Sequence, residues 1–496
     1  MTIRRLPWIA IVMVAASMAA AETTLKVAIT TLPPRMGNPF ATSATPSITT
    51  LSAMYDGLTR IEADGRLIPW LAVSWRAVDA RTWRFELRRD VMFSNDVPLT
   101  SEAVVAAVDY LVNRAAPTDN LRRDLPVLET ARAVDRHTVE IVTKFPEPSM
   151  PRYASVLALP EPGAFRDLGR DGFNKAPVAT GPFIAEAFEP NRAVFRAFKG
   201  GWRPPRVDRL ELIELPDATA RLQAILTGAV HIATGLNPED LAELEAAGHT
   251  GLSWQDGTVS SISLVTTRAL PFNDVRVRLA LNHAVNRAPI IAELLHGRTV
   301  SANQPAARGV HGRDGSIPDY DYDPDKAKRL LAEAGYAKGF SCTLETSGFG
   351  GASVAAYQQV AADLARVGVT MDIRTLQGPQ YLANMFNTGQ YADAVTVPWV
   401  SAPTVDVIRP ILIHSCRSKF AWFCEPSLTP LIEAAQAEWD ETKALDLRRQ
   451  LSRAYHDLAP AIFLYEQVMF TGQHNSARGF SETFGMVAYD RIEVLQ

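Results

Sequence analysis

The chain has few of the residues on which metal centres and thiol chemistry depend. Only three cysteines and nine histidines occur among its 496 residues, and no two histidines stand at metal-ligand spacing. The zinc-binding H-E-x-x-H, the hydrolase G-x-S-x-G and the phosphate-binding Gly-Lys-Ser/Thr signatures are also missing. We therefore expect no metal, no cofactor and no catalytic residues. A secreted hydrolase is the competing class that these absences disfavour.

No charge of one sign dominates the sequence. Lysine and arginine total 50 and aspartate and glutamate total 54, which gives a net charge of −4. An evenly mixed, slightly acidic surface offers no attraction to nucleic acid or to an anionic membrane. No apolar run after residue 21 is long enough to span a bilayer. With 47% hydrophobic and 21% charged residues, the composition is typical of a soluble protein of two or three domains.

The first 21 residues differ from the rest. Arg4 and Arg5 give a positive start, residues 6–16 are mostly apolar, and residues 17–21 are small apart from Met18. This order predicts a secretory signal peptide that is cut after Ala21. No cysteine follows the cut, so we expect an exported protein without a lipid anchor.

The stretch from Pro271 to Pro305 predicts two short helices and an extended segment. Asp274 can cap the first helix by accepting hydrogen bonds from the backbone N–H groups of its opening turn. Asn286 can cap the second, because Pro289 is tolerated only within the first turn of a helix. Gly297 stands where a left-handed C-terminal cap belongs.

This stretch, PFNDVRVRLALNHAVNRAPI, is followed at the expected separation by Tyr322–Tyr336, which reads YDPDKAKRLLAEAGY. Both resemble segments of the second lobe of the family 5 extracellular solute-binding proteins, the peptide- and nickel-type receptors of ABC importers. Tyr55–Thr59 (YDGLT), 68–75 (IPWLAVSW) and Ala179–Phe183 (ATGPF) resemble further segments of that family.

The resemblance implies an α/β fold like that of periplasmic binding proteins, with two α/β lobes around a ligand cleft and an extra domain inserted in the first lobe. The alternation of predicted helices and strands after the opening stretch fits a mixed α/β lobe. The predicted division is a signal peptide at 1–21, lobe I at 22–53, 181–265 and 471–496, an inserted subdomain at 54–180, and lobe II at 266–470.

The resemblance also implies a function. We expect a periplasmic substrate-binding protein of an ABC importer that captures a peptide-like or other polar organic solute by cleft closure. Its partners would be the solute and the transmembrane subunits of the permease, and we expect a monomer and no enzyme. The alternatives are a nickel-chelate receptor, or a ligand-binding sensor or chaperone of the same fold. Some relatives bind nickel chelates with a histidine, but a lone histidine such as His414 is more often structural.

The strongest candidate for the binding site is Tyr391–Asp406, which resembles the strand and loop that wall the cavity in the family. Trp399 matches the family's tryptophan. In peptide receptors an aspartate three residues later pairs with the ligand's ammonium, but here that position is Ala402. Either Asp406 takes over this role or the ligand presents no free amine, and we favour the second. The predicted ligand-binding residues are Asn38, Phe40, Trp399, Ser401, Asp406 and Tyr465.

Two of the cysteines lie close together. Cys416 and Cys424 are eight residues apart, and many family members carry a similar cysteine-flanked loop before a helix. In an oxidising compartment a disulfide is the favoured interpretation, and a pair of buried free thiols is the alternative. Cys342, within the predicted strand Ser341–Thr346, is expected to be a free core thiol.

Overall fold

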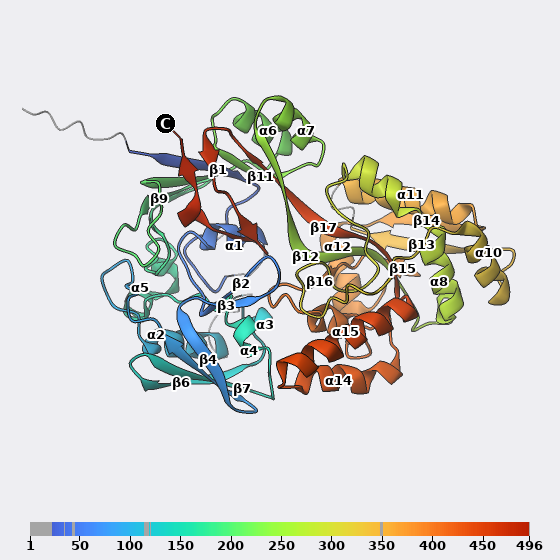
Figure 1. Ribbon diagram of the computed structural model, residues 1–496, viewed down its shortest axis with the longest axis horizontal. Coiled ribbons are helices and arrows are strands. Elements are labelled where there is room, and N and C mark those ends of the chain that lie inside the picture. The colour runs from blue at the N-terminus through green and yellow to red at the C-terminus, as the bar shows by residue number, and fades with distance from the viewer. Residues whose placement is uncertain are drawn as a thin grey trace, which may run out of the picture.

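The computed structural model describes residues 22–33, 35–41, 45–113, 119, 121–347 and 351–495, without the side chains of 45, 46 and 351–353. The predicted signal peptide lies outside these residues. Figure 1 shows two α/β lobes joined by long strands, with the inserted subdomain below the first lobe. The α/β fold with two lobes is therefore confirmed, while the predicted boundaries stay a prediction and serve below as definitions of the three parts.

Eleven strands form one sheet that continues through both lobes. Its order is β14-β13-β15-β12-β17-β11-β1-β10-β9-β8, and β16 pairs with β12 outside this path. The strands of this sheet are β1 Thr24–Ile29, β8 Phe183–Glu189, β9 Arg192–Ala197, β10 Arg209–Glu214, β11 Ile232–Leu236, β12 Thr250–Leu264, β13 Phe340–Thr346, β14 Val369–Thr375, β15 Ala394–Val395, β16 Trp399–Val400 and β17 Ala461–Gln473.

The strands β12 and β17 carry the chain from one lobe to the other. They pair in an antiparallel manner, and the register breaks between Gln255 and Val259. Gly257 within this bulge has φ +75°, and a Cβ atom there would lie 2.6 Å from the Oγ atom of Ser401. Only glycine fits such a left-handed, crowded position without strain. The bulge thus interrupts the pairing of the two strands that cross between the lobes.

The inserted subdomain has its own sheet and its own hydrophobic core. The antiparallel order is β4-β5-β7-β6, with β4 Ala72–Asp79, β5 Thr82–Leu87, β6 Leu128–Asp135 and β7 Thr138–Thr143. Phe85 and Ile141 of this sheet pack against Val104 and Val108 of α2. The helices are α2 Ser101–Val112, α3 Leu121–Asp124, α4 Met150–Tyr153 and α5 Pro162–Phe173. A separate core makes this part a distinct packing unit.

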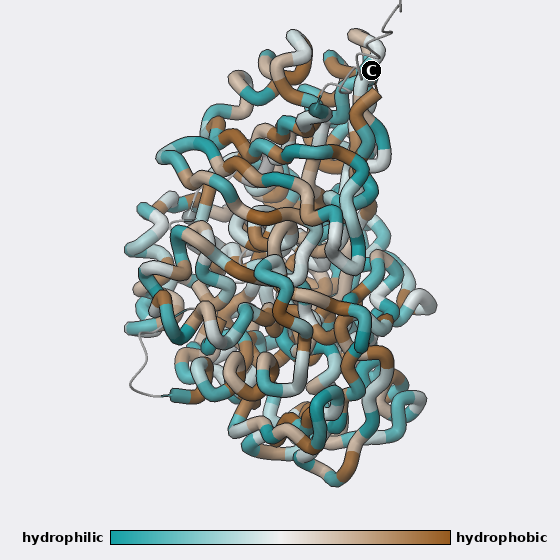
Figure 2. Tube along the Cα trace, turned by 90° about the vertical axis from the view of Figure 1, so that its left-hand side faces the viewer, coloured by the Kyte–Doolittle hydropathy of each residue, from teal (hydrophilic) through white to brown (hydrophobic). Residues whose placement is uncertain are grey.

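The remaining helices belong to lobe I and lobe II. They are α1 Thr45–Leu51, α6 Ala218–Leu226, α7 Asp240–Ala246, α8 Val275–Ala284, α9 Arg287–Pro289, α10 Pro324–Glu333, α11 Gly351–Ala365, α12 Gly378–Ala383, α13 Ile408–Ile413, α14 Thr429–Ala437 and α15 Glu441–Leu458. Three two-stranded sheets are also present, with β2 Thr59–Ile61 on β3 Leu67–Pro69, β18 Ala477–Arg478 on β21 Glu493–Val494, and β19 Glu482–Thr483 on β20 Met486–Val487. In Figure 2 teal hydrophilic turns occupy much of the outline.

The two predicted caps are confirmed, but the second helix differs from the prediction. The Asp274 carboxylate accepts a hydrogen bond from the Arg276 N–H, and the Asn286 side chain accepts one from the Ala288 N–H. After Pro289, however, the backbone continues as a π-helical turn over Ile290–Leu294 rather than as an α-helix. Such turns are rare and leave little signal in hydrophobic spacing.

The predicted disulfide between Cys416 and Cys424 is present. Cys342 is free and buried, and burial raises the pKa of its thiol to about 12. A thiol with so high a pKa is almost never ionised at neutral pH and is therefore unreactive.

Removing the disulfide should lower stability without abolishing the fold. For a loop of eight residues, the chain-entropy model gives a loss of about 2 kcal/mol in the free energy of unfolding when both cysteines become serine. Urea unfolding of Cys416→Ser/Cys424→Ser beside the parent chain measures this difference. Equal midpoints for the double variant and the parent would contradict it.

Candidate functional site

A pocket lies where lobe I, the inserted subdomain and a loop of lobe II meet. It consists of two adjoining spaces of about 630 and 370 Å³, counting the parts open to solvent. Both are lined by Ile48, Ser155, Val156 and Met486. We call the combined space the junction pocket. All three parts of the chain contribute walls to it, so its shape depends on how the lobes are placed.

A buried carboxylate fixes the floor of this pocket. Asp56 accepts hydrogen bonds from Trp70 Nε1 at 2.8 Å, Trp202 Nε1 at 3.2 Å and Thr180 Oγ1 at 2.9 Å. It also pairs with Arg203 Nη2 at 2.7 Å. The two indole rings pack edge to face with centroids 5.1 Å apart. Because four donors already hold Asp56, its carboxylate serves to position the tryptophans rather than to receive a ligand.

The wall that lobe II contributes is apolar. Ala402, Pro403 and Val405 line the smaller space, together with Phe484 of the C-terminal segment. No charged side chain lines this end of the pocket among the described residues. A ligand bound at this end of the pocket would therefore contact the apolar side chains of this wall.

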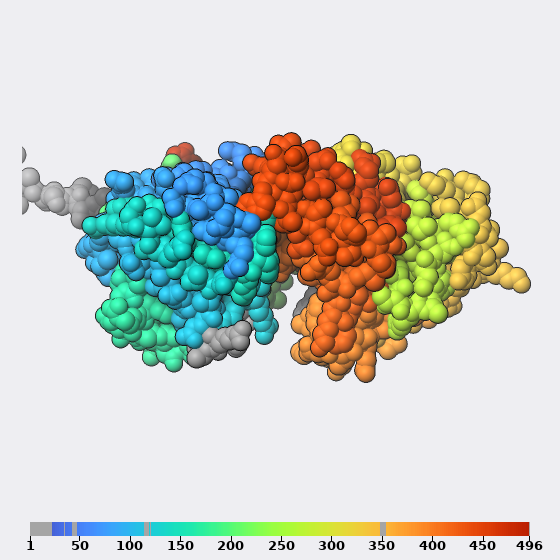
Figure 3. All heavy atoms as spheres, turned by 90° about the horizontal axis from the view of Figure 1, so that it is seen from below, coloured from blue at the N-terminus to red at the C-terminus, as the bar shows by residue number. Residues whose placement is uncertain are grey.

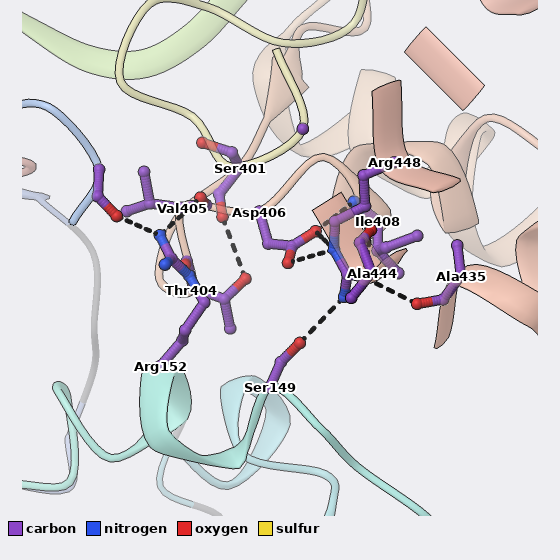
Figure 4. A network of polar contacts seen from close by, with 12 residues as sticks. Ser149, Arg152, Ser401, Thr404, Val405, Asp406, Ile408, Ala435, Ala444 and Arg448 are labelled. Atoms are coloured by element: carbon purple, nitrogen blue, oxygen red, sulfur yellow. Dashed lines mark hydrogen bonds and ion pairs between the residues drawn. The ribbon is translucent and has the colours of Figure 1, made fainter. Parts of the chain in front are cut away.

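The loop behind this wall is held across the boundary between lobe II and the inserted subdomain by Arg152 of α4 (Figure 4). The Arg152 guanidinium donates to the carbonyl oxygens of Thr404 at 2.7 Å and of Val405 at 3.0 Å. It also donates to the carbonyl oxygen of Gly65 at 3.0 Å within its own subdomain. These bonds couple the pocket wall to the position of the inserted subdomain.

An ion pair lies beside Arg152 in the same boundary. Arg448 Nε is 2.8 Å from the Asp406 carboxylate, and Arg448 Nη2 donates to Ser149 Oγ of the inserted subdomain at 3.1 Å. Both charged side chains are at least 96% buried. Burial alone would raise the pKa of Asp406, but the charge of Arg448, helped by His311 and Arg152, holds that pKa below its usual range.

Hollows remain on both sides of these contacts. One of about 1680 Å³ and one of about 880 Å³ separate the inserted subdomain from lobe II, again counting solvent-open parts. Figure 3 shows this boundary as a hollow between the blue-to-cyan inserted subdomain and the orange-to-red part of lobe II. The Trp83 and Trp439 rings stack across it, with centroids 5.4 Å apart. The lobes therefore touch through a limited set of side chains, which suits an interface that opens and closes.

Two of the predicted ligand contacts lie in the loop after β1. Asn38 donates to Asp119 Oδ2 at 3.3 Å and accepts from the Phe40 N–H, while Phe40 stacks on Tyr110 with centroids 4.8 Å apart. Both side chains are fully buried in this conformation, and their neighbour Pro39 lines the junction pocket instead. Their ligand-binding role stays a prediction.

Three more predicted contacts lie on the strands of lobe II or next to them. Trp399 is fully buried, donates to Ser261 Oγ at 3.0 Å and stacks on His414 at 3.7 Å. Ser401 donates to the carbonyl oxygen of Gly257 at 2.6 Å, and Tyr465 is buried in the core of lobe II. None of the three lines the junction pocket in this conformation, although Ala402 next to Ser401 does.

Asp406 is the sixth predicted contact, and its carboxylate forms an ion pair with Arg448. It also accepts from the Ile408 N–H at 2.9 Å. A carboxylate that is already paired inside the protein does not supply the free charge needed for a ligand ammonium. The interpretation in which Asp406 replaces the missing aspartate at Ala402 therefore has no support in this conformation.

Two acids lie beside the bulge of β12. Burial raises the pKa of Asp256 to about 6, and burial together with the charge of Asp256 raises the pKa of Glu482 to about 7. Glu482 is 7% exposed and lies next to Thr483, which lines the pocket. Since the folded state binds these protons more tightly than the unfolded chain, the free energy of unfolding should fall as the pH rises from about 4.5 through about 7.

Replacing Glu482 with glutamine should remove this loss. We expect Glu482→Gln to be more stable than the parent chain by about 2 kcal/mol at pH 8 and by little at pH 4, since the parent carboxyl is protonated there. Urea unfolding at both pH values measures the effect, with the exposed Glu333→Gln as control. The same difference at both pH values would contradict it.

Two α/β lobes that share crossing strands and enclose a pocket define a fold like that of the periplasmic binding proteins. HbpA2 from Haemophilus parasuis superposes with a TM-score of 0.84 at 22% identity, covering 95% of this chain and 100% of that one. NikA from Brucella suis, solved with Fe(III)-EDTA, gives 0.82 at 23% identity, covering 95% and 99%. These likenesses establish the fold.

Sequence comparison gives the family. The model of the bacterial extracellular solute-binding proteins, family 5, matches residues 66–409, and the chain belongs to this family. The dipeptide-binding protein of Escherichia coli (strain K12) is 27% identical over 448 residues, covering 84% of this chain and 83% of that protein. The nickel-binding periplasmic protein of the same strain is 34% identical over 313 residues, covering 58% and 56%. No helix within the described residues is long and apolar enough to cross a membrane.

Proposed function

We propose that the protein is the periplasmic receptor of an ABC importer and captures a peptide-like or other polar organic solute in the junction pocket. The observation that carries this proposal is that one wall of the pocket, Ala402 to Val405, comes from lobe II while the others come from lobe I and the inserted subdomain. A solute that touches all walls binds the closed arrangement better than an open one, which is the condition for ligand-driven closure.

The chain connections support the same mechanism. The strands β12 and β17 cross between the lobes, and the bulge at Gly257 gives them a point of rotation. Family membership and relatives named as dipeptide- and nickel-binding proteins support a receptor that works with a membrane permease. We further propose export through residues 1–21 and action as a monomer.

The nickel-chelate alternative has less support. His414 stacks beneath Trp399, its Nδ1 lies 2.9 Å from the carbonyl oxygen of Pro410, and burial lowers its pKa to about 4. Within the described part of the chain no group of three or more His, Cys, Asp and Glu side chains could hold a metal ion. A sensor or chaperone role would use the same pocket and differ only in the partner that recognises the closed form.

Mass spectrometry of the protein purified without denaturation tests the proposal. We expect a small organic solute to be released on unfolding and to bind again to the emptied, refolded protein in calorimetry. A folded protein that retains no solute and binds no member of a library of peptides and small organic acids would contradict the proposal. Turnover of ester, peptide or glycoside substrates would do so as well.

A further inference from the structure

Arg60 of β2 is the one charged side chain of the junction pocket that has no hydrogen bond and no ion pair with a described residue. Its guanidinium carbon lies 4.6 Å from the centre of the Trp70 ring. The other two charged side chains that line the pocket, Asp56 and Arg203, hold each other, and Arg203 also pairs with Asp490 at 2.8 Å. Asp490 and Glu62 act on Arg60 through their charges, but no acid among the described residues forms an ion pair with it.

The hydroxyl groups around Arg60 are also occupied. Tyr55 donates to the carbonyl oxygen of Gly37 at 2.6 Å and Thr59 to that of Pro151 at 2.6 Å. Ser155 donates to the carbonyl oxygen of Arg152 at 2.7 Å and Ser52 to that of Thr49 at 2.9 Å. Among the described side chains that line the larger space, Arg60 is therefore the hydrogen-bond donor that has no partner, and its five N–H bonds remain free for an occupant.

A partly buried charge without a partner is costly, and an anion that enters the site offsets that cost. Burial and the neighbouring charge of Arg203 lower the pKa of Arg60, against the opposing charges of Asp490 and Glu62. The ring of Trp70 interacts with the guanidinium through its face and fixes its direction. A guanidinium held in one plane is suited to bind a carboxylate through two parallel hydrogen bonds.

We infer that Arg60 binds a carboxylate of the captured solute, so that the solute is an organic acid with an apolar body and needs no free ammonium. This inference rests on the proposed function, in which the junction pocket receives the solute. Ile48, Val156 and Met486 provide an apolar path from Arg60 towards Ala402 and Pro403. Asp56 is the single acid that lines the pocket among the described residues, and it is already engaged, so these residues offer an ammonium no counter-ion.

The position of Arg60 places recognition of the solute's acid group and closure of the lobes on different walls of the pocket. Arg60 and Trp70 belong to the inserted subdomain, while the opposite wall belongs to lobe II. An acid held at Arg60 would direct its apolar end towards the wall formed by residues 402–405. That end would be covered only when the lobes are closed.

The test compares four forms of the full chain by calorimetry: the parent, Arg60→Gln, Arg60→Lys and the control Arg76→Gln, which changes an exposed arginine on β4. The probes are N-acetylphenylalanine, which has a carboxylate and no amine, and phenylalanine amide, which has an amine and no carboxylate. The solute released from the purified parent protein is the third ligand. Equal unfolding midpoints for the four forms establish that each is folded.

We expect N-acetylphenylalanine and the released solute to bind the parent and Arg76→Gln equally well. Binding should be at least tenfold weaker in Arg60→Gln and intermediate in Arg60→Lys, and phenylalanine amide should bind at least tenfold more weakly than the acid. Equal affinities of the parent and Arg60→Gln for the released solute, or a released solute without an acid group, would overturn the inference and leave the proposed function standing. If no ligand binds any of the four folded forms, the proposed function fails and the inference with it.

Discussion

The free energy of unfolding should fall by about 3–5 kcal/mol when Arg448 is replaced by methionine, because the change leaves the charge of Asp406 buried and unpaired. The ion pair is at least 96% buried on both sides, so in this conformation little water reaches the Asp406 carboxylate. Arg448 also donates to the carbonyl oxygens of Ala435 at 2.8 Å and Ala444 at 3.1 Å, which would lose these bonds. The loss should therefore be among the largest for a single substitution in lobe II.

Urea unfolding measures this effect, and two further variants define its cause. Asp406→Asn/Arg448→Met removes both charges and should recover part of the lost stability, because an apolar pair can replace a buried ion pair at little cost. Arg166→Met removes one partner of an exposed pair with Asp167 and should change stability by less than about 1 kcal/mol. A loss below about 1 kcal/mol for Arg448→Met would show that the pair is not buried in solution.

The second large effect concerns binding. Arg152→Met removes two hydrogen bonds that join the inserted subdomain to residues 404 and 405 of lobe II. Hydrogen bonds from a charged donor contribute about 1.5–3 kcal/mol each, but in the open form water takes their place. We therefore expect the affinity for the released solute to fall by about ten- to one-hundredfold, roughly 1.4–3 kcal/mol.

Calorimetry measures the affinity, and hydrogen exchange of the amides in residues 401–407 reports whether the loop is released. Exchange should become faster in the solute-bound Arg152→Met protein than in the bound parent. Arg136→Met, an exposed arginine of the same subdomain, is the matched control and should change neither quantity. An unchanged affinity for Arg152→Met would mean that these bonds do not contribute to the closed state.

Much of the fold could be predicted because its signals are local. Asp274 and Asn286 cap helices at the predicted positions, and Cys416 and Cys424 form the predicted disulfide. The second helix of the same unit could not be predicted in full. The π-helical turn over Ile290–Leu294 keeps an apolar face much like that of an α-helix and differs in its backbone hydrogen bonds.

The site was harder to predict because its contacts join distant parts of the chain. The predicted side chains Phe40 and Ser401 do not line the junction pocket, although their neighbours Pro39 and Ala402 do. Which side chain of a loop faces the pocket depends on pairing, such as that of Trp399 with Val259, which directs the indole into the core. Pairing over such separations leaves no pattern in neighbouring residues.

The contacts of Arg152 could not be predicted from the sequence either. A single arginine in the mostly apolar stretch Met150–Ala154 indicates a buried charge that needs hydrogen-bonding partners. Two of its partners, however, are backbone carbonyl groups about 250 residues further along the chain. Carbonyl groups are present at every position, so no sequence signal marks the ones that a distant arginine will bind.

The central claim is that the lobes close on a solute held in the junction pocket, and small-angle X-ray scattering tests it most directly. The protein is freed of its solute, and its radius of gyration is measured before and after the purified solute is returned at saturating concentration. The account predicts a smaller radius with solute bound, because the lobes rotate together about the bulge at Gly257. An unchanged radius at saturation, with binding confirmed by calorimetry in the same sample, would contradict it.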